Sequence, residues 1–274
     1  VVSTQYTMTL LEELGILKMD FLGLRTLTVI QNAVKEVERI HGVKIDIDHI
    51  PDDDPKVYEL IAQGKTEGVF QLESAGMKSF MKDLQPTRLE DLIAGISLYR
   101  PGPMEFIPKY VKGKKDGKNV TYTHPSLKPI LEPTYGCIVY QEQVMQIVRD
   151  LAGYSLGRSD LVRRAMSKKK ASVMAEERKN FVYGIEGEVP GCVKNGIPAE
   201  TAEKIFDEMT DFAKYAFNKS HAACYAVVGY QTAWLKTYYP VEFMSALMTS
   251  VIDFPSKVSE YIEECRKMGI ELLP

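Results

Sequence analysis

Apolar residues recur at helical spacing in several separate stretches of this chain, and that periodicity constrains the fold more than any other feature. Side chains three and four positions apart share one face of a helix, so each stretch predicts a helix that buries one stripe. A further helix is expected to begin after Ser220 and to run to about Tyr239, where Pro240 ends it. The amphipathic stretches are residues 26–40, 144–151, 205–216 and 257–268.

Three stretches depart from the helical pattern. Residues 14–24 alternate in the manner of a short strand, and residues 98–140 are rich in Pro, Gly and Tyr, which predicts loops with short strands. The acidic residues 45–55 contain two prolines and predict a connector, so a domain boundary is expected between residues 25 and 55. The expected fold class is therefore mainly α, with a small β part (α+β).

Composition and charge exclude several classes of protein. Apolar residues make up 45% of the chain and charged residues 26%, as in globular proteins and unlike disordered or fibrous chains. With 34 basic and 37 acidic residues the net charge is -3, so a polyanion must be held by a local cluster. No stretch approaches 18 uncharged apolar residues, no signal sequence is visible and no two cysteines form a C-x-x-C pair. We therefore expect a cytoplasmic protein that does not enter a membrane.

Five cations lie within eight residues of the segment LVRRAMSKKK. So dense a positive charge in an acidic chain favours a phosphate partner, which Arg binds through two hydrogen bonds and Lys as a point charge. A solvated helix face explains the cluster equally well. The cations are Arg163, Arg164, Lys168, Lys169 and Lys170.

The segment FNKSHAACYA (residues 217–226) places three polar side chains at the start of an expected helix. Asn218 is expected to end the preceding helix, and Lys219, Ser220 and His221 to begin the next. The free N–H groups of a helix N-terminus favour an anion. In the simpler interpretation Ser220 only caps the helix, and both interpretations can hold together.

Two further groups carry weaker signals. Lys18 and Asp20 share one face of the expected strand, where a carboxylate can ligate Mg²⁺; spacing alone favours an exposed ion pair. Arg100, Tyr140 and Gln141 lie in expected loops, and the planes of Arg and Tyr can stack on bases. Core and turn roles explain these three residues equally well.

Six motifs together resemble one family, the bacterial C-family replicative DNA polymerases, which are polymerase III alpha subunits. They occur in the order of that family and span essentially the whole chain. The motifs are LKMDFLGLRTLT, GVFQLES, RPGP, LEPTYGCIVYQEQVMQI, LVRRAMSKKK and FNKSHAACYA. The resemblance implies a fragment in which residues 1–25 form the C-terminal edge of the palm and residues 26–274 form a multi-helical fingers domain.

The resemblance also implies roles for single residues. Asp20 is similar to the third catalytic aspartate of the palm, which helps to hold two Mg²⁺ ions, and Lys18 is similar to the catalytic-site lysine of the palm beside it. The residues implied to face the incoming deoxynucleoside triphosphate (dNTP) are Arg163, Arg164, Lys219, Ser220 and His221. Those implied to lie near the nascent base pair and the sugar are Arg100, Tyr140, Gln141 and Tyr225.

The implied activity is DNA-directed DNA polymerisation in replication, with template-primer DNA, the sliding clamp and other replisome subunits as partners. The family carries two further catalytic aspartates upstream of the matched motifs, so the fragment alone is expected to be inactive. The alternative is a non-catalytic helical module that binds phosphate or nucleic acid. Both interpretations predict the two basic sites, and they differ on Asp20, which is a metal ligand in the first and an ordinary ion-paired surface residue in the second. The nucleotide interpretation also predicts that Arg163, Arg164, Lys219 and Ser220 converge on one phosphate site.

Overall fold

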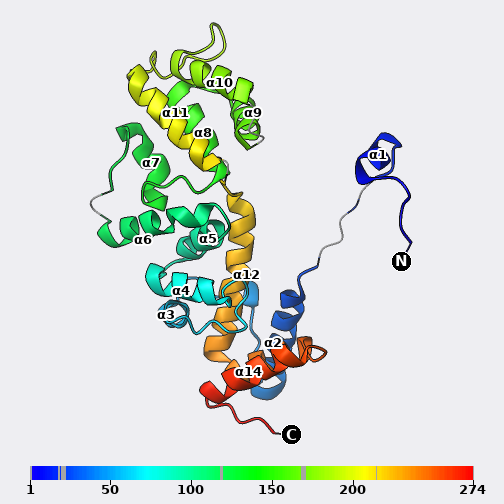
Figure 1. Ribbon diagram of the computed structural model, residues 1–274. Coiled ribbons are helices and arrows are strands. Elements are labelled where there is room, and N and C mark those ends of the chain that lie inside the picture. Colours follow the sequence, from blue (N-terminus) through cyan, green and yellow to red (C-terminus); the bar gives the residue numbers. More distant parts are fainter. Residues whose placement is uncertain are drawn as a thin grey trace.

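Helices make up most of the described part of the chain (Figure 1). The computed structural model describes residues 2–17, 19, 23–117, 120–167, 171–213 and 215–273. Within these ranges no strand forms, and β structure is limited to isolated bridges that pair Tyr140 with Phe217 and Ile185 with Val189. The expected mainly helical fold is confirmed.

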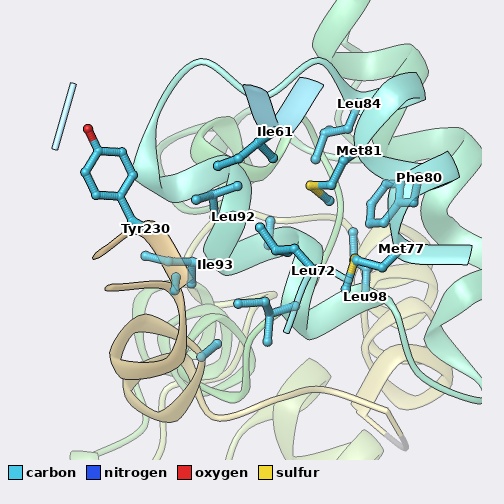
Figure 2. Close-up of a cluster of buried hydrophobic side chains, with 14 of the residues drawn as sticks. Ile61, Leu72, Met77, Phe80, Met81, Leu84, Leu92, Ile93, Leu98 and Tyr230 are labelled. Atoms are coloured by element: carbon cyan, nitrogen blue, oxygen red, sulfur yellow. The ribbon is translucent and has the colours of Figure 1, made fainter. Parts of the chain in front are cut away.

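A central apolar core lies among five helices. α12 packs most extensively against α5 and also against α3. Figure 2 shows Leu72 among the side chains of Met77, Leu92 and Leu98, with Tyr230 contributed by α12. The five helices are α3 (Pro55–Ala62), α4 (Ala75–Leu84), α5 (Leu89–Leu98), α6 (Ile107–Asp116) and α12 (Lys219–Tyr238).

A second core joins the helices that lie at the top of Figure 1. α8 packs against α9, and α10 packs against α11. The rings of Phe181 and Phe206 meet inside this core with their centroids 5.6 Å apart. Its helices are α7 (Lys128–Leu131), α8 (Gln141–Ala152), α9 (Leu156–Ser167), α10 (Ala171–Tyr183) and α11 (Ala199–Ala213).

A third core lies at the other end of α12, where α13 packs against α2 and α14 (Figure 1). Val29, Phe243 and Tyr261 are buried there, one from each of these three helices. α2 spans Arg25–His41, α13 spans Pro240–Ser250 and α14 spans Pro255–Lys267. The remaining elements are α1 (Met8–Glu13), which buries no residue, and the 3-10 helices η1 (Ile47–His49), η2 (Pro103–Phe106), η3 (Pro125–Leu127) and η4 (Glu132–Thr134).

α12 connects the first core to the third. Ala222, Ala226 and Tyr230 recur at four-residue spacing and pack into the first core, whereas Leu235 packs into the third. Next to Leu235, the buried Lys236 ammonium donates a hydrogen bond of 2.7 Å to Glu264 of α14. α12 therefore packs into the first core along its N-terminal half and into the third core at its C-terminal end.

The helix boundaries largely follow the expected signals. α2 ends at Gly42, whose φ of 69° is the left-handed conformation that favours glycine at this position. α12 begins where expected, but its N-cap is Asn218, whose Oδ1 accepts a hydrogen bond of 2.9 Å from the His221 N–H. The interpretation of Ser220 as the cap is therefore wrong. Asn218 does not end the preceding helix either, because α11 ends at Ala213.

The short strands expected within residues 98–140 are wrong where the structure describes that stretch. It forms α6, α7 and three 3-10 helices instead. Pro103, Pro108 and Pro125 each stand in the first turn of one of these elements, where the missing N–H is not needed. The strand expected within residues 14–24 centres on Lys18 and residues 20–22, which lie outside the described part of the chain.

Among the described helices, none combines the length and the apolar character needed to cross a lipid bilayer.

Candidate functional site

Helices α8 and α12 begin side by side. The Gln141 N–H donates a hydrogen bond of 2.9 Å to the Phe217 carbonyl, and the Phe217 N–H donates one of 3.1 Å to the Val139 carbonyl. The first turn of each helix carries N–H groups that have no carbonyl partner within the helix. Two positive helix ends in close proximity favour an anion. We call residues 140–142 and 217–221 the helix junction.

Arg163 of α9 contacts the helix junction. Its Nη1 donates a hydrogen bond of 2.9 Å to Oε1 of Gln141, the first residue of α8. The Gln141 Nε2 in turn donates one of 3.2 Å to the Ala216 carbonyl, just before α12. The Gln141 side chain therefore links the basic segment of α9 to the start of both helices.

Asp160 orients the two arginines of α9. Its carboxylate accepts a hydrogen bond of 2.7 Å from Nη2 of Arg163 and lies 2.7 Å from Nε of Arg164. The hydrogen bond from Arg163 lowers the pKa of Asp160 below its usual value. Arg163 is 22% exposed and Arg164 is 63% exposed, so Arg163 is held against the protein and Arg164 projects into solvent.

Lys219 approaches the helix junction from α12. Its backbone N–H donates to the Glu142 carboxylate at 3.1 Å, and its Nζ lies 5.3 Å from the centroid of the Tyr140 ring. Lys219 and Arg163 therefore both contact the first turn of α8, although they are far apart in the sequence. Ser220 is exposed at the second position of α12, beside Lys219.

A cavity of about 590 Å³ lies beside the helix junction, and we call it the central cavity. Arg100, His221 and Tyr225 line it, so it brings together three of the residues that the sequence had marked. The Arg100 guanidinium lies 4.1 Å from the centroid of the Phe217 ring and donates a hydrogen bond of 2.8 Å to the Tyr215 carbonyl. Burial lowers the pKa of Arg100.

Four rings form a continuous row along the central cavity. Phe217 and His221 have centroids 5.3 Å apart, and His221 and Tyr225 have centroids 4.3 Å apart. The row ends at Phe70, whose centroid lies 5.1 Å from that of Tyr225. Phe217, His221 and Tyr225 recur at four-residue spacing, which places them on one face at the start of α12. His221 belongs to both the helix junction and the central cavity.

The other marked residues have different positions. Tyr140 is 4% exposed and packs into the central core, so its ring anchors the helix junction to that core. Burial raises the pKa of its hydroxyl well above the usual value. Lys18, Asp20 and residues 168–170 lie outside the described part of the chain.

Sequence reasoning missed two kinds of residue. Asp160 precedes Arg163 and Arg164 by three and four positions, a spacing that predicts ion pairs on one helix face and was available in the sequence. Arg25 and Gln71 also line the central cavity; they lie within the motifs LKMDFLGLRTLT and GVFQLES, but the sequence assigned no role to either residue. Only the folded chain shows that these two residues lie there.

The described residues contain no group of three or more His, Cys, Asp or Glu side chains that could hold a metal ion. The described residues alone therefore do not form a magnesium site.

Comparison with known proteins identifies close relatives. Residues 26–188 match the family model of the bacterial DNA polymerase III alpha subunit finger domain. The chain is 50% identical over 276 residues to the DNA polymerase III subunit alpha of Thermus aquaticus. It is 48% identical to the subunits of Bacillus subtilis (271 residues) and Borreliella burgdorferi (272 residues). These alignments cover 99% of this chain but only 22% to 24% of each relative, so the chain spans about a quarter of their length.

Proposed function

Because this chain belongs to the finger-domain family of bacterial DNA polymerase III alpha subunits, we propose that it binds the incoming dNTP and template-primer DNA within a replicative DNA polymerase. Residues 26–274 are the fingers in this proposal, and residues 1–25 are the edge of the palm. The observation that carries it is that Arg163 and Lys219 both contact the first turn of α8.

In this proposal the triphosphate binds at the helix junction. Arg163 and Lys219 supply positive charge there, and the positive dipole ends of α8 and α12 add to it. The exposed Arg164 and Ser220 are additional ligands for the phosphate oxygens. The net negative charge of the chain makes this local concentration of cations the feature that selects a polyanion.

The base and sugar lie toward the central cavity in this proposal. His221 and Tyr225 offer ring faces for stacking, and Arg100 adds a cationic plane. Stacking on aromatic and guanidinium planes does not depend on which base is present, as a polymerase requires. Tyr140 and Gln141 act as positioning residues for the helix junction.

The proposed reaction is attack of the primer 3′-hydroxyl on the α-phosphate, in which a new P–O bond forms and pyrophosphate leaves. Positioning and charge stabilisation dominate phosphoryl transfer. Arg163 and Lys219 stabilise the charge that develops on the leaving pyrophosphate.

Asp20 is the proposed ligand of the two Mg²⁺ ions, and Lys18 lies next to it in the active site. One carboxylate does not hold two divalent ions, and the described residues add no metal-binding cluster. The remaining ligands therefore belong to other parts of the full-length subunit. The sliding clamp and the other replisome subunits are proposed partners of that subunit, and the cytoplasm is its proposed location.

The experiment that tests the function compares wild-type and Asp20→Asn full-length subunits in primer extension. If the subunit is a polymerase, Asp20→Asn should abolish its turnover. The variant should still bind template-primer DNA and keep the unfolding temperature of the wild type. A non-catalytic binding module shows no template-dependent extension even as the wild type. In the same assay, residues 1–274 alone are expected to give no Mg²⁺-dependent extension, and detectable extension by them would contradict the role assigned to the missing ligands.

A further inference from the structure

Gln71 stands on the wall of the central cavity with a backbone φ of 64°. Left-handed backbone conformations are disfavoured for residues other than glycine, and they persist where the surrounding structure fixes them, often at functional sites. Among the described residues other than glycine, only Gln71, Gln85 and Tyr135 have a positive φ. Gln71 is the only one of these three that lines the central cavity.

The segment that carries Gln71 is fixed on both sides. Leu72 is 1% exposed and packs among the core side chains that Figure 2 shows. Its carbonyl accepts a hydrogen bond of 2.6 Å from the Thr66 hydroxyl. On the other side, the Phe70 N–H donates one of 3.1 Å to the buried Thr232 hydroxyl of α12. The backbone of Gln71 is thereby held in place before any ligand binds.

The amide of Gln71 has no hydrogen-bond partner among the described residues, and Gln85 shows the contrast. Gln85 has the same backbone conformation, but its Nε2 donates hydrogen bonds of 2.7 Å to the Lys82 carbonyl and 3.2 Å to the Ala62 carbonyl. The left-handed conformation of Gln85 is therefore explained by the end of α4. The left-handed conformation of Gln71 has no such explanation, and the exposed Gln71 side chain lies at the central cavity.

The rings beside Gln71 determine which ligand group this amide meets. Phe70 precedes it and contacts Tyr225, the last α12 ring of the row. The polar edge of a planar base lies to the side of its stacking faces, and Gln71 is one of the residues at the side of this cavity. A Gln side chain supplies two N–H donors and one carbonyl acceptor to such an edge.

On the basis of the proposed function, we propose that Gln71 is a specificity-determining residue that donates a hydrogen bond to the minor-groove edge of the nascent base pair. Purine N3 and pyrimidine O2 are acceptors that every correct base pair displays in the minor groove. A donor directed at these atoms accepts all four correct pairs. A mismatched pair displaces the acceptor and loses the hydrogen bond.

The first test measures single-nucleotide insertion by the full-length subunit carrying Gln71→Gly, with Gln85→Gly as the matched control. Glycine accepts the positive φ at both positions. We expect Gln71→Gly to lower the efficiency of correct insertion about threefold to tenfold, as for loss of one neutral hydrogen bond. Incorrect insertion should change less. Gln85→Gly should stay within about twofold of the wild type, and equal effects of the two variants would overturn the inference.

The second test removes the acceptor instead of the donor. 3-Deazaadenine lacks N3 and is placed first in the incoming nucleotide and then, in a separate series, in the template. At one of these two positions the analogue should lower the insertion efficiency of the wild type by the same threefold to tenfold. At that position the analogue should not lower the insertion efficiency of Gln71→Gly any further. If the loss from the analogue and the loss from Gln71→Gly multiply at both positions, Gln71 does not contact this edge. Absence of any insertion by the wild type would overturn the proposed function and this inference with it.

Discussion

Arg163 of α9 donates a hydrogen bond of 2.9 Å to the side-chain oxygen of Gln141, the first residue of α8. This contact brings a basic segment to the place where α8 and α12 begin. It joins two parts of the chain that the sequence marks separately, and a proposed triphosphate site depends on it.

Replacing Gln141 with Leu should weaken dNTP binding, because Arg163 loses the acceptor that holds it at α8 and the Ala216 carbonyl loses its donor. The expected rise in the apparent Kd for dNTP is about threefold to tenfold, as for one neutral-to-charged hydrogen bond that only positions a ligand. Single-turnover primer extension separates this rise from a change in the maximal rate, which should stay within about twofold. Gln141→Glu keeps the acceptor for Arg163 and should show a smaller effect. Gln63→Leu, which removes a surface hydrogen bond to Glu59, serves as the control.

The carboxyl group of Asp160 should titrate below the usual Asp pKa of about 3.9, because Arg163 donates to its ionised form. The pairing is complete above pH 4 and is lost as the pH falls through the lowered pKa. Carbon NMR of the carboxyl group measures this midpoint. Arg163→Gln should raise it toward the usual value while leaving Glu36, whose pKa is lowered by Arg39, unchanged. An unchanged Asp160 midpoint in the variant would contradict the assigned contact.

Lys236→Met should destabilise the protein strongly. The Lys236 ammonium is buried, and it donates to Glu264 and to the carbonyls of Lys65 and Glu67. Burial lowers the pKa of Lys236, and its removal leaves Glu264 buried without its cation. Loss of one partner from such a pair costs about 3–5 kcal/mol.

Urea unfolding measures that loss, with Lys44→Met as the control. Lys44 pairs with Glu38 on the surface, where an ion pair contributes about 0–1 kcal/mol. Combining Lys236→Met with Glu264→Leu should recover much of the stability, because no buried charge then remains. Equal losses for Lys236→Met and Lys44→Met would show that the buried pair does not stabilise the contact between α12 and α14.

Helix positions could be predicted from the sequence because local signals specify them. The period of apolar residues predicted α2, α8, α11 and α14, and Pro240 marks an end that the structure confirms. The stretch 98–140 misled because Pro, Gly and Tyr are common both in loops and in short helices. Which of the two forms there depends on burial of residues such as Tyr110 of α6, a tertiary effect that local composition does not contain.

The candidate site was only partly predictable for the same reason. Charge density marked Arg163, and the start of a helix marked Lys219, but their common contact with α8 depends on the bridge between Tyr140 and Phe217. Such a pairing between distant segments leaves no periodic signal in a single sequence. Gln71 lies in the motif GVFQLES but carries no charge, and its position at the central cavity became visible only in the folded chain.

The most direct test of a shared triphosphate site is a double-mutant cycle on the full-length subunit with Arg163→Ala and Lys219→Ala. The measured quantity is the apparent Kd for dNTP in single-turnover primer extension. Each single variant should weaken binding about tenfold to hundredfold, as for loss of a charged hydrogen bond, and Lys204→Ala on α11 should change nothing. If both cations hold one triphosphate at the first turn of α8, the two substitutions are coupled. The factor by which the double variant raises the apparent Kd for dNTP should then be clearly smaller than the product of the two single factors. If the two single factors multiply fully, or if either single variant leaves the Kd unchanged, the shared triphosphate site is contradicted.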